Sequence, residues 1–205
     1  MINAERLARD IVVVGGSAGG VTPIMSLLER LPSNLPAAMA VVVHRHPFHE
    51  TRLPQVLGRR CRLTVVEPLD GDPVQRGTVY VAPRDQHLVF NDGVVRLDRG
   101  PKQHRTRPAI DPLFVSASAC YGPRVLGILF SGLGSDGVSG FLTIKAGGGI
   151  TLVQTPSDAE FPTMPLRALR GDDVDGALSV GELGDAVASL ASGGIFSNGA
   201  RPAAA

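Results

Sequence analysis

Three unbroken runs of apolar residues constrain the fold of this chain more than any other feature. They span residues 11–14, 39–43 and 125–130, and each stops abruptly at glycine or polar residues. A strand that is apolar along its whole length is buried on both faces, as in parallel sheets covered by helices on both sides. Helical spacing of apolar residues follows the first run, over 23–31, and the third, over 138–146. We therefore predict an α/β fold with a doubly wound, mostly parallel sheet flanked by helices.

The middle of the chain predicts a smaller antiparallel element. Short strands are expected over 63–66 and 78–82, separated by turn residues rather than by helices. The turn Asn91-Asp92-Gly93 joins two further strands, 88–90 and 94–97, into a small hairpin. Beyond it, helices are expected over 111–119, 164–170 and 182–190, and Ser179 is a candidate N-cap of the last one.

Length and composition favour one globular domain. A chain of 205 residues that is 43% hydrophobic and 19% charged can bury one sizeable core. We expect a domain over residues 1–190 and a flexible, Gly-rich tail over 191–205. Twenty Lys and Arg residues against nineteen Asp and Glu residues leave a net charge of +1, so bulk charge favours neither nucleic acid nor an anionic membrane.

The expected location is the cytoplasm. No apolar run approaches the roughly 18 residues that a membrane span needs, and the first ten residues do not form an apolar signal core. Cys61 and Cys120 lie far apart and form no metal or redox motif, which fits two reduced thiols buried as small apolar side chains. No cofactor is expected.

Three chemically useful side chains follow the three apolar runs. They are Ser17, His44 and Asp136, which are a candidate nucleophile, base and carboxylate. The carboxyl ends of parallel strands meet at one edge of a sheet, where the ligand sites of this fold class lie. Ser17 is the centre of Gly15-x-Ser17-x-Gly19, which matches the Gly-x-Ser-x-Gly turn that exposes a nucleophilic serine between a strand and a helix. The sequence thus predicts a hydrolytic site of the Ser-His-Asp type.

Other interpretations of these residues remain open. The Gly-rich turn could bind a phosphate or a dinucleotide, although Ser17 takes the place of the middle glycine and no Walker lysine follows. His44, His46 and His49 could instead hold a metal ion in a metal hydrolase. Asp136 could serve only as a turn or cap residue, and Asp85 and Asp111 are rivals for its role beside the base.

Several separated blocks of the chain resemble one known family. They are the turn 15–20 with Ser17, His44 at a strand end, Tyr80-Val81-Ala82-Pro83, Arg107-Pro108 with Asp111, the turn 132–137, and Met164-Pro165. Together they resemble the catalytic domain of the CheB-type chemotaxis receptor methylesterases, also called protein-glutamate methylesterases. The resemblance covers roughly residues 10–190, and it implies the same doubly wound parallel fold.

The resemblance implies hydrolysis of glutamyl methyl esters on methyl-accepting chemoreceptors, often with deamidation of receptor glutamines. It assigns Ser17 as nucleophile, His44 as base and Asp136 as the residue that orients the base. Ala18 and Val43 stand where family members often carry threonine and glutamine. Because only about ten residues precede the first strand, we expect a domain without the usual receiver, which is either controlled by a separate response regulator or signalling partner or constitutively active.

Three residues are weaker candidates for contact with the substrate. The backbone N–H of Ala18, and one in the turn around Leu133, are expected to hold the developing oxyanion. Arg107 belongs to a basic loop with Lys102 and Arg105, which either meets an acidic receptor surface or is simply solvated. A binding module without catalytic activity is a further alternative.

Overall fold

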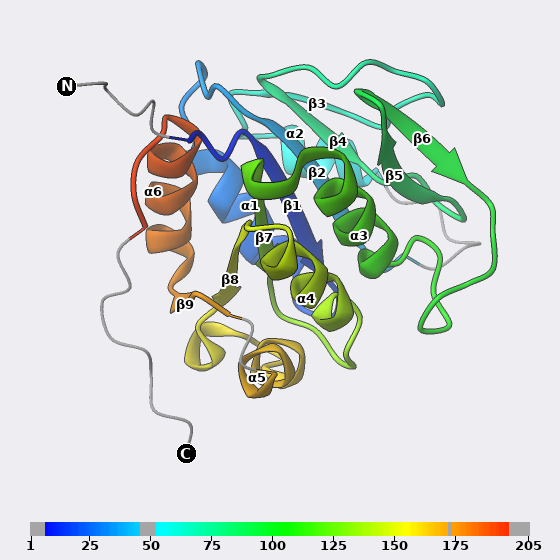
Figure 1. Cartoon of the computed structure of the whole chain (residues 1–205). Helices are drawn as coiled ribbons and strands as arrows, with labels where there is room; N and C mark the ends of the chain where they lie inside the picture. The colour runs from blue at the N-terminus through cyan, green and yellow to red at the C-terminus, as the bar shows by residue number, and fades with distance from the viewer. Residues whose placement is uncertain (1–6, 46–51, 172–173, 197–205) are drawn as a thin grey trace.

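A seven-stranded parallel sheet forms the centre of the molecule (Figure 1). The computed structural model describes residues 7–45, 52–171 and 174–196. The strand order is β3-β4-β2-β1-β7-β8-β9, and every neighbouring pair is parallel. The strands are β1 (Ile11–Gly16), β2 (Ala38–Val43), β3 (Thr64–Val66), β4 (Thr78–Val81), β7 (Val125–Leu129), β8 (Ile150–Gln154) and β9 (Gly176–Leu178). The predicted doubly wound, parallel α/β sheet is confirmed.

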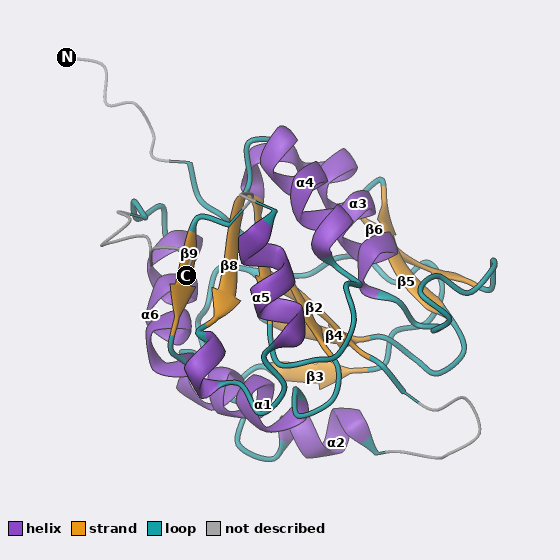
Figure 2. Ribbon diagram, turned by 90° about the horizontal axis from the view of Figure 1, so that it is seen from below, coloured by secondary structure: helices purple, strands orange, loops and turns teal. Residues whose placement is uncertain are grey.

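Helices cover both faces of the sheet (Figure 2). One layer consists of α1 (Val21–Arg30), α2 (Leu53–Gly58) and α6 (Val180–Ala191). The other consists of α3 (Ile110–Tyr121), α4 (Val138–Ala146) and α5 (Thr163–Arg170). In β1, Val12 and Val14 enter the first core, whereas Ile11 and Val13 enter the second. The strand contacts a core through each face, which explains why it is apolar throughout.

The predicted hairpin is also present. β5 (His87–Asn91) and β6 (Val94–Asp98) pair in antiparallel register, and Asn91 lies opposite Val94. Asp92 and Gly93 form the turn, with φ angles of 51° and 80° that correspond to the tight turn favoured in two-residue hairpins. The hairpin packs on α3 and adds a small second sheet beside the main one.

The last helix begins where its capping residue predicts. Ser179 Oγ accepts the Glu182 N–H at 3.4 Å, and the Glu182 carboxylate accepts the Ser179 N–H at 2.8 Å. These two bonds form a capping box, so α6 starts at Val180. The helix ends at Ala191, and residues 197–205 of the expected tail lie outside the described residues.

Two details differ from the expectations. Cys120 is exposed and Cys61 is only half-buried, so neither thiol is the fully buried side chain that was expected. The short strand β9 was not predicted. Among the described residues, no helix is both long enough and apolar enough to cross a membrane.

Candidate active site

The topology of the sheet brings three strand ends together. β1 lies between β2 and β7, so the segments that follow these three strands meet at one edge. Gly16 at the end of β1 lies beside Val43 at the end of β2, which places Ser17 next to His44. The Ser17 N–H also bonds to the carbonyl of Ser131, the second residue after β7, at 3.0 Å. The turn that carries Asp136 is therefore anchored to the turn that carries Ser17.

The structure brings Ser17, His44 and Asp136 into one chain of hydrogen bonds. Ser17 Oγ lies 3.0 Å from His44 Nδ1, and His44 Nε2 lies 2.7 Å from Asp136 Oδ2. An ionised carboxylate can only accept, so the Nε2 nitrogen carries the proton and Nδ1 presents its lone pair to the serine hydroxyl. In this tautomer the imidazole can take the hydroxyl proton of Ser17.

Asp136 is held rigidly by the start of a neighbouring helix. The residue is 1% exposed, and its carboxylate accepts the backbone N–H groups of Ile110 at 2.7 Å and Asp111 at 2.9 Å. These groups belong to the first turn of α3, which has no capping side chain of its own. The carboxylate thus satisfies two helix N–H groups while it faces His44.

Asp111 performs the reciprocal task for α4. Its Oδ1 accepts the N–H groups of Gly137 at 3.0 Å and Gly140 at 2.7 Å, at the start of a helix that also lacks a local cap. Asp136 lies two residues before α4 and caps α3, and Asp111 lies in the first turn of α3 and caps α4. This exchange locks the two helices together beneath His44. Sequence inspection named Asp111 as a rival for the role of Asp136 and as part of one family block, but did not predict this cap.

The pKa of Asp136 is set by opposing effects. Burial by itself raises the pKa of a carboxyl group, because the charged form loses its hydration. The hydrogen bond from His44 and the two backbone N–H groups of α3 stabilise the charged form more strongly, so the pKa of Asp136 lies below its ordinary value. Asp136 is therefore ionised at neutral pH, as its place beside an imidazole requires.

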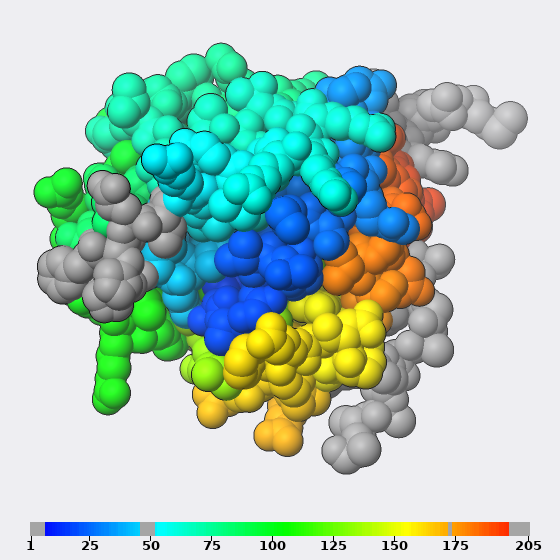
Figure 3. Space-filling view, turned by 180° about the vertical axis from the view of Figure 1, so that it is seen from behind, coloured from blue at the N-terminus to red at the C-terminus, as the bar shows by residue number. Residues whose placement is uncertain are grey.

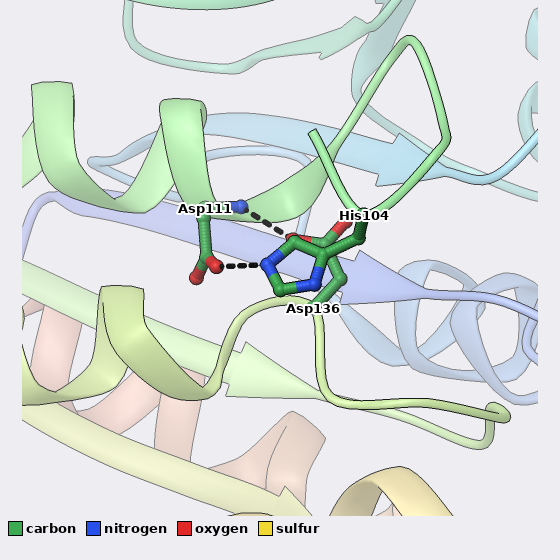
Figure 4. Close-up of side chains that lie close together, drawn as sticks. All are labelled: His104, Asp111 and Asp136. Carbon is green, nitrogen blue, oxygen red and sulfur yellow. Dashed lines mark hydrogen bonds and ion pairs between the residues drawn. The ribbon is translucent and has the colours of Figure 1, made fainter. Parts of the chain in front are cut away.

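His104 completes a second histidine–aspartate pair beside the first (Figure 4). Its Nε2 lies 2.8 Å from Asp111 Oδ2 and 3.9 Å from Asp136 Oδ1. One ligand-type atom from each of these three residues lies within 4.8 Å of the others, a spacing that a metal ion could bridge. However, both oxygens of Asp136 and Oδ1 of Asp111 already accept N–H groups, so helix capping accounts for the cluster. Sequence reasoning missed this role of His104, because no local motif signals it.

The turn after β1 leaves backbone donors available near Ser17. Within the described part of the chain, the Ala18 N–H donates to no acceptor, whereas the Ala18 carbonyl accepts the Ser131 hydroxyl at 2.8 Å. Gly132 is packed tightly against the serine: a Cβ at Gly132 would lie 2.9 Å from Ser17 Cβ. The next residue, Leu133, is 55% exposed at this edge. The expectation that Ala18 and Leu133 donate to an oxyanion stays a prediction.

Arg107 holds the basic loop together. Its Nε and Nη2 atoms lie 3.0 and 2.8 Å from Asp85 Oδ1, and its Nη1 atom donates to the carbonyls of Arg99 and Gly100. The hydrogen bond from Arg107 lowers the pKa of Asp85. Asp85 is thus engaged by Arg107 rather than by His44. Contact of Arg107 with a substrate stays a prediction.

The metal alternative involves residues that the structure does not describe. His46 and His49 lie outside the described ranges. Both ring nitrogens of the third candidate ligand, His44, already face Ser17 and Asp136.

A parallel α/β sheet with a hydrogen-bonded serine, histidine and aspartate at its carboxyl edge defines an α/β domain with a site of the serine-hydrolase type. The chain belongs to the CheB methylesterase family, whose sequence profile matches residues 12–187. The expected family resemblance is thereby confirmed.

Known relatives agree with this assignment. A protein-glutamate methylesterase/protein-glutamine glutaminase 2 from Anaeromyxobacter dehalogenans is 39% identical over 186 residues, which are 90% of this chain and 54% of the relative. A protein-glutamate methylesterase/protein-glutamine glutaminase from Symbiobacterium thermophilum is 34% identical over 184 residues, 89% of this chain and 51% of the relative. The chain thus spans about half the length of these two relatives.

The fold has a close counterpart among solved structures. The CheB methylesterase catalytic domain of Thermotoga maritima superposes with a TM-score of 0.84 at 31% sequence identity. The match covers 88% of this chain and 98% of that domain.

Proposed function

We propose that this protein is a protein-glutamate methylesterase that hydrolyses glutamyl methyl esters through Ser17, His44 and Asp136. The observation that carries the proposal is the continuous hydrogen-bond chain between these three side chains in a member of the CheB methylesterase family. The names of two relatives pair this activity with glutamine deamidation, which we propose as a second reaction of the same site.

Acylation begins with proton transfer to the imidazole. His44 Nδ1 accepts the proton of the Ser17 hydroxyl while Oγ attacks the ester carbonyl carbon. The protonated imidazole then donates this proton to the leaving methoxide, so methanol departs and a glutamyl ester of Ser17 remains. The ionised Asp136 keeps the ring oriented and stabilises its charged form.

Deacylation repeats the sequence with water. His44 removes a proton from a water molecule that attacks the acyl carbon, and the serine oxygen leaves with a proton from the imidazole. The products are a free glutamate side chain and the original Ser17. With a glutamine substrate the first leaving group is ammonia, and the same acyl-enzyme follows.

Backbone N–H groups stabilise the tetrahedral intermediates in this proposal. The Ala18 N–H is next to the nucleophile and lies three residues before the start of helix α1, whose positive end favours negative charge. A second donor comes from the turn that contains Leu133, and Arg107 contributes to docking of the substrate protein.

The proposed partners are methyl-accepting chemoreceptor-like proteins, together with a response regulator or signalling protein that controls the activity. We propose that the enzyme acts in the cytoplasm, without inserting into the membrane, binding nucleic acid or using a cofactor.

Methanol release from membranes that carry methylated receptors tests the function. The Ser17→Ala variant is expected to lose activity by several orders of magnitude, because the Ser17 hydroxyl is the group that accepts the acyl group in this mechanism. Ser33→Ala is a matched control, since Ser33 is exposed in the loop between α1 and β2 and precedes the opposite edge of the sheet. Full activity of a folded Ser17→Ala protein would rule out the serine mechanism.

A further inference from the structure

The loop between β8 and α5, which is distant from Ser17 in the sequence, lies directly beside the turn that carries Ser17. Figure 3 shows this loop, the yellow segment that precedes α5, in contact with the blue segment at the start of α1. Ser131 joins the two: its hydroxyl donates to the Ala18 carbonyl at 2.8 Å and accepts the Phe161 N–H at 2.9 Å. The Gly132 N–H also donates to the Phe161 carbonyl, at 2.9 Å. The backbone position of the preceding residue, Glu160, is therefore fixed relative to Ser17.

The side chain of Glu160 lies against Gly19. A Cβ at Gly19 would sit 2.9 Å from both Cβ and Oε2 of Glu160, so the carboxylate lies over the backbone two residues beyond Ser17. Gly19 has a φ of +69°, and its lack of a side chain is what allows this close approach. Glu160 is exposed, and its carboxylate forms no hydrogen bond or ion pair with any residue in the described ranges.

Two other charged side chains named above are already engaged. Asp136 is buried against His44, and Arg107 is bound to Asp85 and to backbone carbonyls. Glu160 thus places an accessible negative charge beside the serine. Such a charge attracts cationic groups and repels anionic ones over a distance comparable to the Debye length.

We propose that Glu160 is a specificity-determining residue that favours glutamyl methyl esters with a lysine or arginine close to the ester on the substrate. The inference rests on the proposed function, because it concerns the substrate of that same site. A basic neighbour pairs with the Glu160 carboxylate, whereas a neighbouring free glutamate is repelled by it. Glu160 touches none of the reacting atoms in this proposal and acts on binding.

Paired peptides test the proposal. Two helical peptides each carry one γ-glutamyl methyl ester, with either lysine or glutamate one turn away, and kcat/KM is measured from methanol release. The wild-type protein is expected to prefer the lysine peptide. Glu160→Gln is expected to reduce the lysine-to-glutamate ratio by about two- to five-fold, mainly through KM, as is usual for an exposed charge pair. Glu160→Lys is expected to reduce it further.

A matched variant and salt provide controls. Glu29→Gln removes an exposed glutamate that pairs with Arg60 near the last turn of α1, and it is expected to leave the ratio unchanged. Raising the ionic strength is expected to bring the wild-type ratio towards that of Glu160→Gln. If both Glu160 variants keep the lysine-to-glutamate ratio of the wild-type protein, the proposal is overturned.

A peptide-binding assay distinguishes the proposed role of Glu160 from the proposed methylesterase activity. The same peptides are titrated by fluorescence anisotropy against Ser17→Ala and Ser17→Ala/Glu160→Gln proteins. If the wild-type protein hydrolyses neither peptide, but Ser17→Ala prefers the lysine peptide and the double variant does not, the proposed activity fails and the role of Glu160 stands. If both peptides are hydrolysed at a ratio independent of Glu160, the activity stands and this inference fails. Absence of both hydrolysis and Glu160-dependent binding contradicts both.

Discussion

Replacing Asp136 with asparagine removes one buried charge at nearly constant shape. The carboxylate accepts three N–H groups, from His44 at 2.7 Å, Ile110 at 2.7 Å and Asp111 at 2.9 Å. Oδ2 accepts from both His44 and Ile110, and Oδ1 accepts from Asp111. Asparagine offers one acceptor oxygen and one NH₂ group, so one of these two oxygen positions must become a donor. The substitution therefore affects both the tautomer of His44 and the cap of α3.

The cost can be worked out from the two orientations of the amide. If its nitrogen takes the place of Oδ2, it faces both His44 and the Ile110 N–H. The imidazole must then accept at Nε2 and carry its proton at Nδ1, where it can no longer take the Ser17 proton, and the Ile110 N–H loses its acceptor. If its nitrogen faces Asp111 instead, a buried backbone N–H loses its acceptor at about 1–3 kcal/mol. We expect kcat to fall by about 10³- to 10⁴-fold, equivalent to about 4–5.5 kcal/mol of activation free energy.

The assay combines methanol release with urea unfolding. We expect a loss of stability of about 1–3 kcal/mol at neutral pH, from the cap that α3 loses. Because the folded-state pKa of Asp136 is lowered, its charge stabilises the fold above the ordinary aspartate pKa, and this contribution disappears as the pH falls through the folded-state value. The stability difference between wild type and variant is thus expected to shrink in acid.

Asp185→Asn is the matched control for this substitution, since Asp185 is exposed on α6. It is expected to change neither kcat nor stability appreciably. An Asp136→Asn protein that is folded and keeps more than about a tenth of the wild-type kcat would refute the assignment of Asp136 as the residue that orients His44.

The remaining predictions concern packing, pH and metals. Gly132→Ala places a methyl group 2.7 Å from Met164 Cε and 2.9 Å from Ser17 Cβ, and should lower kcat by up to about 100-fold through displacement of the serine, with thermal unfolding measured as the control for folding. Asp10 is buried, which would raise its pKa, but hydrogen bonds from Arg124 and Arg76 lower it overall. In urea unfolding, Asp10→Asn should therefore cost about 1–2 kcal/mol at neutral pH and progressively less as the pH falls below about 4. Dialysis against a chelator should leave methanol release unchanged, and a loss of activity that zinc restores would favour the metal alternative.

Sequence reasoning succeeded where local pattern and topology agree. Continuous apolar runs predicted the buried strands, and the residues after three of them, Ser17, His44 and Asp136, meet because β1 lies between β2 and β7. The N-cap of α6 was predicted from Ser179 alone, and the structure adds the reciprocal bond with Glu182 three residues later. Each of the three site residues is signalled within its own short segment of the chain, and the parallel sheet brings the three segments together.

Other features depend on contacts that no local pattern encodes. The exchange of caps between Asp111 and Asp136 joins residues 25 to 29 positions apart, and it exists only because α3 and α4 pack side by side. His104 reaches Asp111 from the tip of a turn, where its φ is +48°. The strand β9 has only three residues, of which one is glycine, and pairing with β8 rather than its own pattern defines it.

The most direct test of the central claim is to trap the acyl-enzyme on Ser17. The protein is mixed with a glutamyl methyl ester peptide, quenched in acid during turnover, digested and mapped by mass spectrometry. We predict an adduct of peptide minus methanol on the fragment that contains Ser17, and none on the Ser17→Ala protein. Rapid methanol release without any adduct at Ser17, together with methanol release that persists in the Ser17→Ala protein, would contradict the covalent serine mechanism.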